Sequence, residues 1–225
     1  MIIPDVLTPE QVRHFRDCLK GARWSDGAET AGSLARHVKR NQQLDDDKEP
    51  ARTLSRDILH SLAGNAAFVS AALPGRIFPP KFNRYRDGGT YGPHIDNAMM
   101  QLPGSNQTMR TDLAATLFLS APQEYEGGEL TIQTDAGPHQ FKPALGSLVL
   151  YPATSVHFVT PVVRGERVAA FFWIQSMVRS VRGREMLYRL DRTVQALTSE
   201  LGGGHAEVTN LTGLYHNLLR LWADA

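Results

Sequence analysis

A histidine and a carboxylate stand two positions apart in YGPHIDNAMM, residues 91–100, at the end of the glycine-rich turn RDGGTYG. On an extended segment, residues at i and i+2 point to the same face, so His94 and Asp96 can bind the same metal ion. Imidazole and carboxylate groups both bind metal ions. An H-x-D triplet also arises by chance, as an ordinary polar patch at the end of a strand. The pair therefore needs a third ligand from elsewhere in the chain.

His157 is the histidine best placed to supply that ligand. It opens HFVTPVV directly after SLVLYPATSV, where a strand, a proline turn and a second strand would aim it into a barrel. Two histidines and one aspartate leave three of six coordination positions open, as in non-haem Fe(II) oxygenases. Zinc hydrolysis is the rival chemistry, but it would need a glutamate general base as in H-E-x-x-H, and the sequence lacks that motif. The other histidines are expected at surface or structural positions: His14, His37, His60, His139, His205 and His216.

Arg167 follows His157 by ten residues, on the next expected strand beyond VRGE. If the chain turns near Gly165, the two residues should lie on adjacent antiparallel strands about 4.8 Å apart. An arginine inside a small barrel is costly unless an anion pairs with it. The far carboxylate of a dicarboxylate cosubstrate would meet that need while its other end chelates iron. A surface arginine in the turn is the alternative.

The composition bounds the class of protein. The chain has 225 residues, 42% of them hydrophobic and 21% charged, which fits one large domain or one domain with a small appendage. A formal net charge of +1 gives no reason to expect nucleic acid as a partner. No stretch approaches the roughly 18 apolar residues that would span a membrane. The single cysteine, Cys18, excludes an internal disulfide, so we expect a cytoplasmic protein.

In the N-terminal third of the chain the apolar residues recur at helical spacing. Thr8, Pro9 and Gln11 form a capping box that predicts a helix ending near Gly21. Two further helices are expected over 53–63 and 65–72, and the polar segment between the first and second helix is expected to be a loop with one short helical turn.

From Phe78 to Ser176, short apolar or alternating runs follow one another at roughly 8–12-residue spacing, which predicts a β-sandwich or β-barrel. No helix-length segment lies between these runs, so a parallel α/β sheet is not expected.

The last 45 or so residues return to a helical period. GGG at 202–204 separates two amphipathic runs, which predicts a helical hairpin over about 180–225. Each run carries an apolar stripe that must be covered by the barrel, by the N-terminal helices or by a second subunit. A homo-oligomer through these helices therefore stays open. The stripes are Leu190, Val194, Leu197 and Leu201 in the first run, and Leu211, Leu214, Leu218 and Trp222 in the second.

The order H-x-D, about sixty residues, H, then ten residues to R resembles the Fe(II)/2-oxoglutarate-dependent dioxygenases of the prolyl 4-hydroxylase superfamily. Over nearly the whole chain, the closer resemblance is to the bacterial PKHD-type hydroxylases. It rests on several motifs in matching order and spacing: DGAETAGSLARHVKRNQQL, KFNRYRDGGTYGPHIDNAMM, YEGGELTI, GSLVLYPATSVHFVTPVVRGERVAAFFWIQS and RSVRGREMLYRLDR.

The resemblance implies an α+β fold that is mainly β. Its core would be a double-stranded β-helix, or jelly roll, with N-terminal helices packed on it and a C-terminal helical hairpin. The implied division is a dioxygenase domain over 1–177, helical to about residue 75 and β from about residue 76, followed by a helical extension over 178–225.

The resemblance also implies the roles of particular residues. His94, Asp96 and His157 would bind Fe(II), and Arg167 would bind the C5 carboxylate of 2-oxoglutarate. Tyr85 matches a position where related hydroxylases place a cosubstrate-binding tyrosine, and a core aromatic is the alternative. Where related enzymes have a second tyrosine, this chain has Leu117.

The expected activity is hydroxylation of an unactivated C–H bond, using O2 and 2-oxoglutarate and releasing succinate and CO2. L-ascorbate is a further candidate cofactor. A protein residue, a free amino acid or a small natural product could be the substrate. The alternative is a cupin-like binding or sensing module that holds metal without turnover, and Arg167 favours the enzyme over that module.

Overall fold

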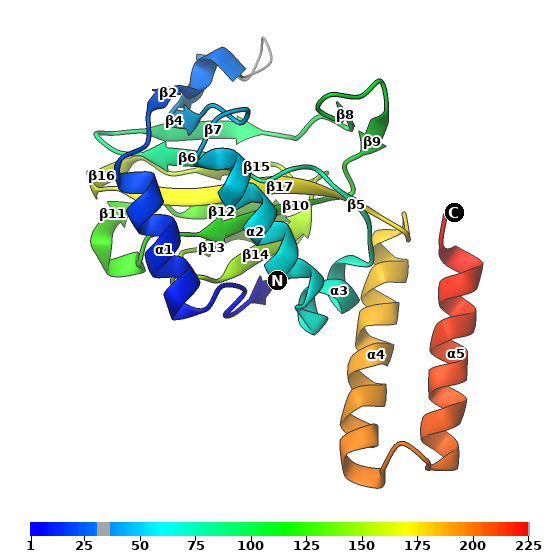
Figure 1. Ribbon diagram of the computed structural model, residues 1–225. Helices are drawn as coiled ribbons and strands as arrows, with labels where there is room; N and C mark the ends of the chain where they lie inside the picture. The colour runs from blue at the N-terminus through cyan, green and yellow to red at the C-terminus, as the bar shows by residue number, and fades with distance from the viewer. Residues whose placement is uncertain (31–36, 225) are drawn as a thin grey trace.

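Two antiparallel β-sheets face each other in the computed structural model, which describes residues 1–30 and 37–224 (Figure 1). Every strand pairing within these residues is antiparallel, as the absence of intervening helices in the sequence predicted. The large sheet has the order β1 (Ile2–Ile3), β14 (Leu148–Pro152), β10 (Leu113–Phe118), β17 (Arg167–Ser176), β6 (Lys81–Tyr85), β4 (Gln42–Leu44) and β2 (Trp24–Asp26), with β5 (Pro74–Ile77) also on β17. The small sheet has the order β13 (Gly137–Phe141), β12 (Leu130–Thr134), β15 (His157–Val159), β7 (Thr90–His94) and β3 (Lys39–Arg40).

Two short two-stranded ribbons accompany these sheets in the described part of the chain. One pairs β11 (Tyr125–Gly127) with β16 (Val162–Gly165), and the other pairs β8 (Met99–Gln101) with β9 (Thr108–Arg110). In the first ribbon Gly127 has a φ of +74°, and a Cβ there would lie 2.0 Å from the Pro161 carbonyl oxygen. The backbones approach so closely that only glycine fits, which supports a structural role for the glycine pair before β12.

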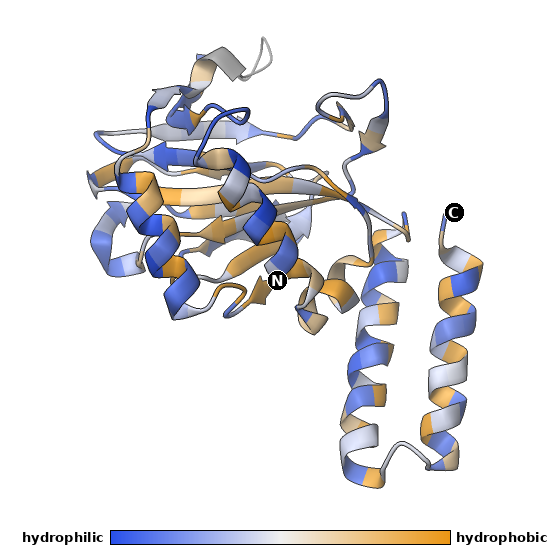
Figure 2. Cartoon of the chain, in the orientation of Figure 1, coloured by the Kyte–Doolittle hydropathy of each residue, from blue (hydrophilic) through white to orange (hydrophobic). Residues whose placement is uncertain are grey.

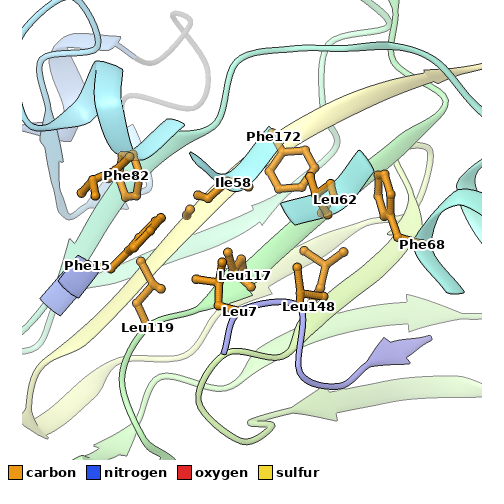
Figure 3. Close-up of a cluster of buried hydrophobic side chains, with 14 of the residues drawn as sticks. Leu7, Phe15, Ile58, Leu62, Phe68, Phe82, Leu117, Leu119, Leu148 and Phe172 are labelled. Atoms are coloured by element: carbon orange, nitrogen blue, oxygen red, sulfur yellow. The ribbon is translucent and has the colours of Figure 1, made fainter. Parts of the chain in front are cut away.

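The outer face of the large sheet is covered by α1 (Pro9–Lys20), α2 (Ala51–Ala63) and α3 (Ala66–Ala72) (Figure 1). The capping box predicted for α1 is confirmed: Gln11 N donates to Thr8 Oγ1, and Thr8 N donates to Gln11 Oε1. The apolar faces of these helices pack on side chains of that outer face of the sheet, such as Phe82 and Phe172, in the cluster of Figure 3. This core fixes the sheet whose opposite face lines the site.

The segment between α1 and α2 differs from its prediction. A loop with one helical turn was expected, and the structure instead contains β2, the 3₁₀ helix η1 (Gly27–Thr30), β3 and β4. The predicted helical turn is present as η1, but the strands were not predicted, because they are two or three residues long and mostly polar, too short to show a hydrophobic period. Part of the predicted stretch, residues 31–36, lies outside the described residues.

The predicted C-terminal helical hairpin is confirmed as α4 (Val181–Leu201) and α5 (Ala206–Trp222). The two helices lie side by side and extend away from the sheets (Figure 1). Leu187 and Val208 are buried, whereas Val181, Met186, Leu201, Leu214 and Leu221 remain 46% to 75% exposed, and apolar residues occur along both helices (Figure 2). No helix among the described residues is long and apolar enough to cross a membrane.

Leu187 attaches this hairpin to the rest of the molecule. Its side chain is fully buried and packs in a small cluster with Leu73 and Val178. We expect Leu187→Ala to lower the free energy of unfolding by about 2–5 kcal/mol, the usual cost of a cavity in place of a buried leucine. Met186→Ala is the matched control, because Met186 is 53% exposed. Equal urea midpoints for the two variants would contradict this role.

Candidate metal centre and the cavity around it

His94 and His157 lie side by side on adjacent strands of the small sheet, with their ring centroids 4.2 Å apart. His94 ends β7, His157 begins β15, and the two residues are direct partners in the strand register. Asp96 lies two residues beyond the end of β7. One ligand atom from each of the three residues lies within 4.8 Å of the others. The structure therefore brings together the three residues that the spacing singled out.

Backbone carbonyls hold both imidazole rings. His94 Nδ1 lies 2.8 Å from the Gly92 oxygen, and His157 Nδ1 lies 3.0 Å from the Ser155 oxygen. A carbonyl oxygen only accepts, so each Nδ1 must carry the hydrogen and each Nε2 keeps its lone pair. This is the arrangement usual for metal-binding histidines.

Asp96 completes the donor set. Its Oδ2 is buried without a hydrogen-bond partner among the described residues, 3.8 Å from His157 Nε2. Burial raises the pKa of the Asp96 carboxyl, since a charged oxygen without a partner is costly there. A divalent cation at this point would pair with that oxygen. Two neutral imidazoles and one carboxylate suit Fe(II), so the residues present fit the metal.

His94 is held neutral. Burial and the neighbouring His157 lower the pKa of His94 to about 4. The ring of Tyr91 also stacks on it, with the centroids 3.6 Å apart and the planes 16° apart. A neutral imidazole with a fixed ring can bind metal at neutral pH without first losing a proton.

This lowered pKa predicts a pH dependence for the metal-free protein. Between pH 6.5 and 4 the unfolded chain binds a proton at His94 that the folded chain does not, so stability falls as the pH falls through this window. We expect this to cost on the order of 1–3 kcal/mol. The measurement is urea unfolding after chelation of metal, at pH 7 and pH 4.5. His94→Asn should lose less stability than wild type, and His139→Asn, at an exposed position on β13, should behave as wild type.

Arg167 begins β17 and is 1% exposed. Its Nε and Nη1 have no hydrogen-bond partner among the described residues. Its guanidinium carbon lies 5.3 Å from the ring centroid of Tyr85 and 4.8 Å from that of Phe118. A buried cation with unpaired N–H groups needs an anion, and the planar fork of arginine matches a carboxylate.

The predicted position of Arg167 beside His157 is wrong. His157 lies in the small sheet and Arg167 in the large sheet, so the two are not on adjacent strands. The cause is β16, which pairs with β11 instead of returning beside β15 and carries the chain across to the other sheet. Both residues nevertheless line one cavity, so the chemical relation that was expected does not depend on strand adjacency.

Tyr85 lies on β6 opposite Arg167 in the register and is 1% exposed. Burial raises the pKa of its hydroxyl, which therefore keeps its proton. Tyr85 belongs to the apolar cluster between the sheets and also lines the cavity. Its position is compatible with both roles considered from the sequence, cosubstrate binding and core packing.

The cavity has a volume of about 690 Å³. Pockets that hold drug-sized ligands measure about 300–1,000 Å³, so there is room for a substrate beside a small cosubstrate. Sequence reasoning missed several lining residues. These are the aromatic Tyr91, Tyr151 and Trp173 and the polar Lys39, Asn41, Gln43 and Asn83. The first three had no distinguishing spacing, and most of the polar group falls in the segment expected to be a loop.

Two solved structures show a similar arrangement of sheets. A Pseudomonas putida prolyl-4-hydroxylase aligns with a TM-score of 0.54 at 19% identity, covering 78% of this chain and 91% of that one. HygX from Streptomyces hygroscopicus, with nickel and 2-oxoglutarate bound, aligns with a TM-score of 0.54 at 14% identity, covering 78% and 82%. These identities show the fold alone, which is the predicted jelly roll. Residues 80–175, which include the candidate metal ligands and Arg167, match the 2OG-Fe(II) oxygenase superfamily.

Residues 182–224 match the PKHD-type hydroxylase C-terminal domain. A PKHD-type hydroxylase of Pseudoalteromonas atlantica is 53% identical over 222 residues, 99% of this chain and 98% of that protein. One from Acidovorax ebreus is 53% identical over 221 residues, 98% of this chain and 97% of that protein. The chain belongs to the PKHD-type hydroxylases. It is an enzyme, a dioxygenase of the hydroxylase type, from a family that uses Fe(II) and 2-oxoglutarate.

Proposed function

We propose that the enzyme hydroxylates an unactivated C–H bond of its substrate. One atom of O2 enters the new hydroxyl group and the other enters succinate, while 2-oxoglutarate loses CO2. The observation that carries the proposal is Arg167, a buried guanidinium with unpaired N–H groups in the same cavity as the His94, Asp96 and His157 cluster. A module that only holds metal would need the three ligands, but it would have no use for a buried arginine beside them.

Each residue has a defined task in this proposal. His94 and His157 bind Fe(II) through Nε2, and Asp96 binds it through a carboxylate oxygen. The iron, when bound, supplies the activation of O2 and the oxidative loss of CO2 from 2-oxoglutarate. Arg167 binds the far carboxylate of the cosubstrate through two parallel hydrogen bonds. Tyr85 positions the same cosubstrate from the neighbouring strand.

Structural neighbours with this fold have different classes of molecule bound. Structural neighbours include a Trichoplax adhaerens prolyl hydroxylase in complex with a peptide fragment and HygX with hygromycin B bound. Our proposal covers a protein residue, an amino acid or a small natural product.

On the family resemblance the proposal also includes L-ascorbate as an auxiliary cofactor, a dioxygenase domain over 1–177 and a helical extension over 178–225. The single cysteine supports action in the cytoplasm, and the exposed leucines of α4 and α5 support a homo-oligomer.

The test is cosubstrate turnover. Purified chain loaded with Fe(II) should convert 2-oxoglutarate to succinate in air, with O2 consumed in equal amount, even slowly without a substrate. Before air is admitted, Fe(II) and 2-oxoglutarate together should give a weak visible charge-transfer band. The same protein loaded with Zn(II) is the control and should form neither the band nor succinate. Stoichiometric Fe(II) binding without any response to 2-oxoglutarate would favour the metal-binding module.

A further inference from the structure

Residues 39–43 cross from the small sheet to the large sheet and turn three polar side chains into the cavity. β3 pairs with β7 at one end of this strap, and β4 pairs with β6 at the other. Lys39, Asn41 and Gln43 are 8%, 7% and 4% exposed and line the cavity, whereas Arg40 between them is exposed. An inward face of this kind is ordinarily apolar, because buried polar groups need partners.

Asn83 extends this polar surface onto β6. It is the register partner of Gln43, is 7% exposed and lines the cavity. The alternation of the strand places Asn83 on the cavity side, while Phe82 points into the helix-covered core (Figure 3). On the strap, Lys39 Nζ donates to Gln43 Oε1 at 3.1 Å. Asn83 therefore lies next to the strap on the same wall.

Two of these side chains have unpaired amide atoms. Within the described part of the chain, Asn41 Nδ2, Asn41 Oδ1 and Asn83 Oδ1 are buried without a hydrogen-bond partner of normal geometry, and the Asn41 amide also lies close to the Tyr85 hydroxyl. Asn41 Oδ1 packs against Gly27, so the wall presents one donor group to the cavity, Asn41 Nδ2, and one acceptor, Asn83 Oδ1. Carboxylate and keto oxygens only accept, so 2-oxoglutarate could pair with the donor but not with the acceptor. A ligand that pairs with both must carry an N–H or O–H group as well as an acceptor.

We propose that Asn41 and Asn83 bind an amide group of the primary substrate. An amide carbonyl accepts from one asparagine nitrogen, and an amide N–H donates to the other asparagine's oxygen, so the match also holds if oxygen and nitrogen are exchanged in both side chains together. Lys39 and Gln43 flank this contact. The proposal rests on the proposed function, since it assigns the substrate of the same cavity. The amide belongs either to a peptide main chain or to an amide-bearing small molecule.

The test uses two probe sets, each with a matched ester. N-acetyl-L-amino acid N-methylamides represent the peptide main chain, and primary carboxamides of simple aliphatic and aromatic acids represent small molecules. Methyl esters of the same acids keep the carbonyl acceptor but lack the N–H of that group. Binding to the holoenzyme with Fe(II) and 2-oxoglutarate is measured without O2 by calorimetry. Succinate release stimulated by each probe is then measured in air. The variants are Asn83→Leu and Asn41→Leu, with Gln133→Leu, at an exposed position on β12, as control.

We expect one probe set to bind wild type and the Gln133 variant, and the set that binds identifies the source of the amide. Wild type should bind the matching esters at least tenfold more weakly than the amides. Both asparagine variants should bind the amides at least tenfold more weakly than wild type does. The melting temperatures of the asparagine variants should stay at or above that of wild type, because leucine removes unpaired polar atoms.

Four results would overturn the amide site, three of them measured as binding. They are the failure of every amide to bind wild type, equal binding of amides and esters, and a tenfold loss of 2-oxoglutarate affinity in the asparagine variants. A melting temperature lowered in both asparagine variants would also overturn it, since it would show a packing role. A chain that binds amides but never converts 2-oxoglutarate would contradict the proposed function and leave the amide contact standing.

Discussion

Arg167→Ala is expected to weaken 2-oxoglutarate binding by roughly 30- to 4,000-fold. Truncating one partner of a buried, hydrogen-bonded charge pair costs about 2–5 kcal/mol, and each 1.4 kcal/mol is about tenfold in affinity. The guanidinium is 1% exposed, so little solvent screens the contact. Arg167→Lys should recover only part of the loss, because an ammonium keeps the charge but cannot form the two parallel hydrogen bonds.

The measurement is an anaerobic titration of the Fe(II)-loaded variants with 2-oxoglutarate, following the charge-transfer band, with succinate release measured in parallel. Iron affinity should hardly change, since Arg167 is not proposed as a ligand. Arg164→Ala is the matched control, because the side chain of Arg164 is 82% exposed on β16, three residues earlier. Equal 2-oxoglutarate affinity in wild type and both Arg167 variants would remove the main support for an oxygenase.

His157→Ala is expected to abolish turnover and to lower Fe(II) affinity by more than the about 10–100-fold that loss of an outer-shell partner costs. The fold should persist, because the sheets close around apolar clusters that do not include the three ligands. His139→Ala, at an exposed position in the same sheet, is the control. Anaerobic calorimetry with Fe(II) and thermal unfolding would be compared. A His157 variant that bound stoichiometric iron and turned over normally would show that the metal centre lies elsewhere.

The sequence could predict the parts of this molecule that depend on local chemistry. The spacing of His94 and Asp96 predicts a shared face wherever the segment is extended, and the proline turn before His157 aims it inward. The capping box at Thr8 and the glycines at 202–204 mark helix ends by backbone requirements that hold in any fold. These features needed no knowledge of which strands pair.

Strand pairing set the limit of sequence prediction. A ten-residue separation is compatible with a hairpin, but whether β16 returns beside β15 depends on the partner offered by β11, far away in the sequence. The strap at 39–43 shows the same limit, because its strands are defined by hydrogen bonds to β7 and β6 and not by their own residues. Propensity describes a segment, whereas the register is a property of two segments together.

The two carbonyl contacts that hold the imidazole rings have a consequence for the supply of metal in the cell. Because both rings already present Nε2, little reorganisation opposes the entry of any divalent ion of similar size. Sites of this kind follow the general order of affinities, in which Ni(II), Cu(II) and Zn(II) all exceed Fe(II). If the proposed ligands hold the iron, its selection rests on which ion is available when the chain folds, and we expect the fraction of active enzyme to follow the composition of the metal pool in which it was made.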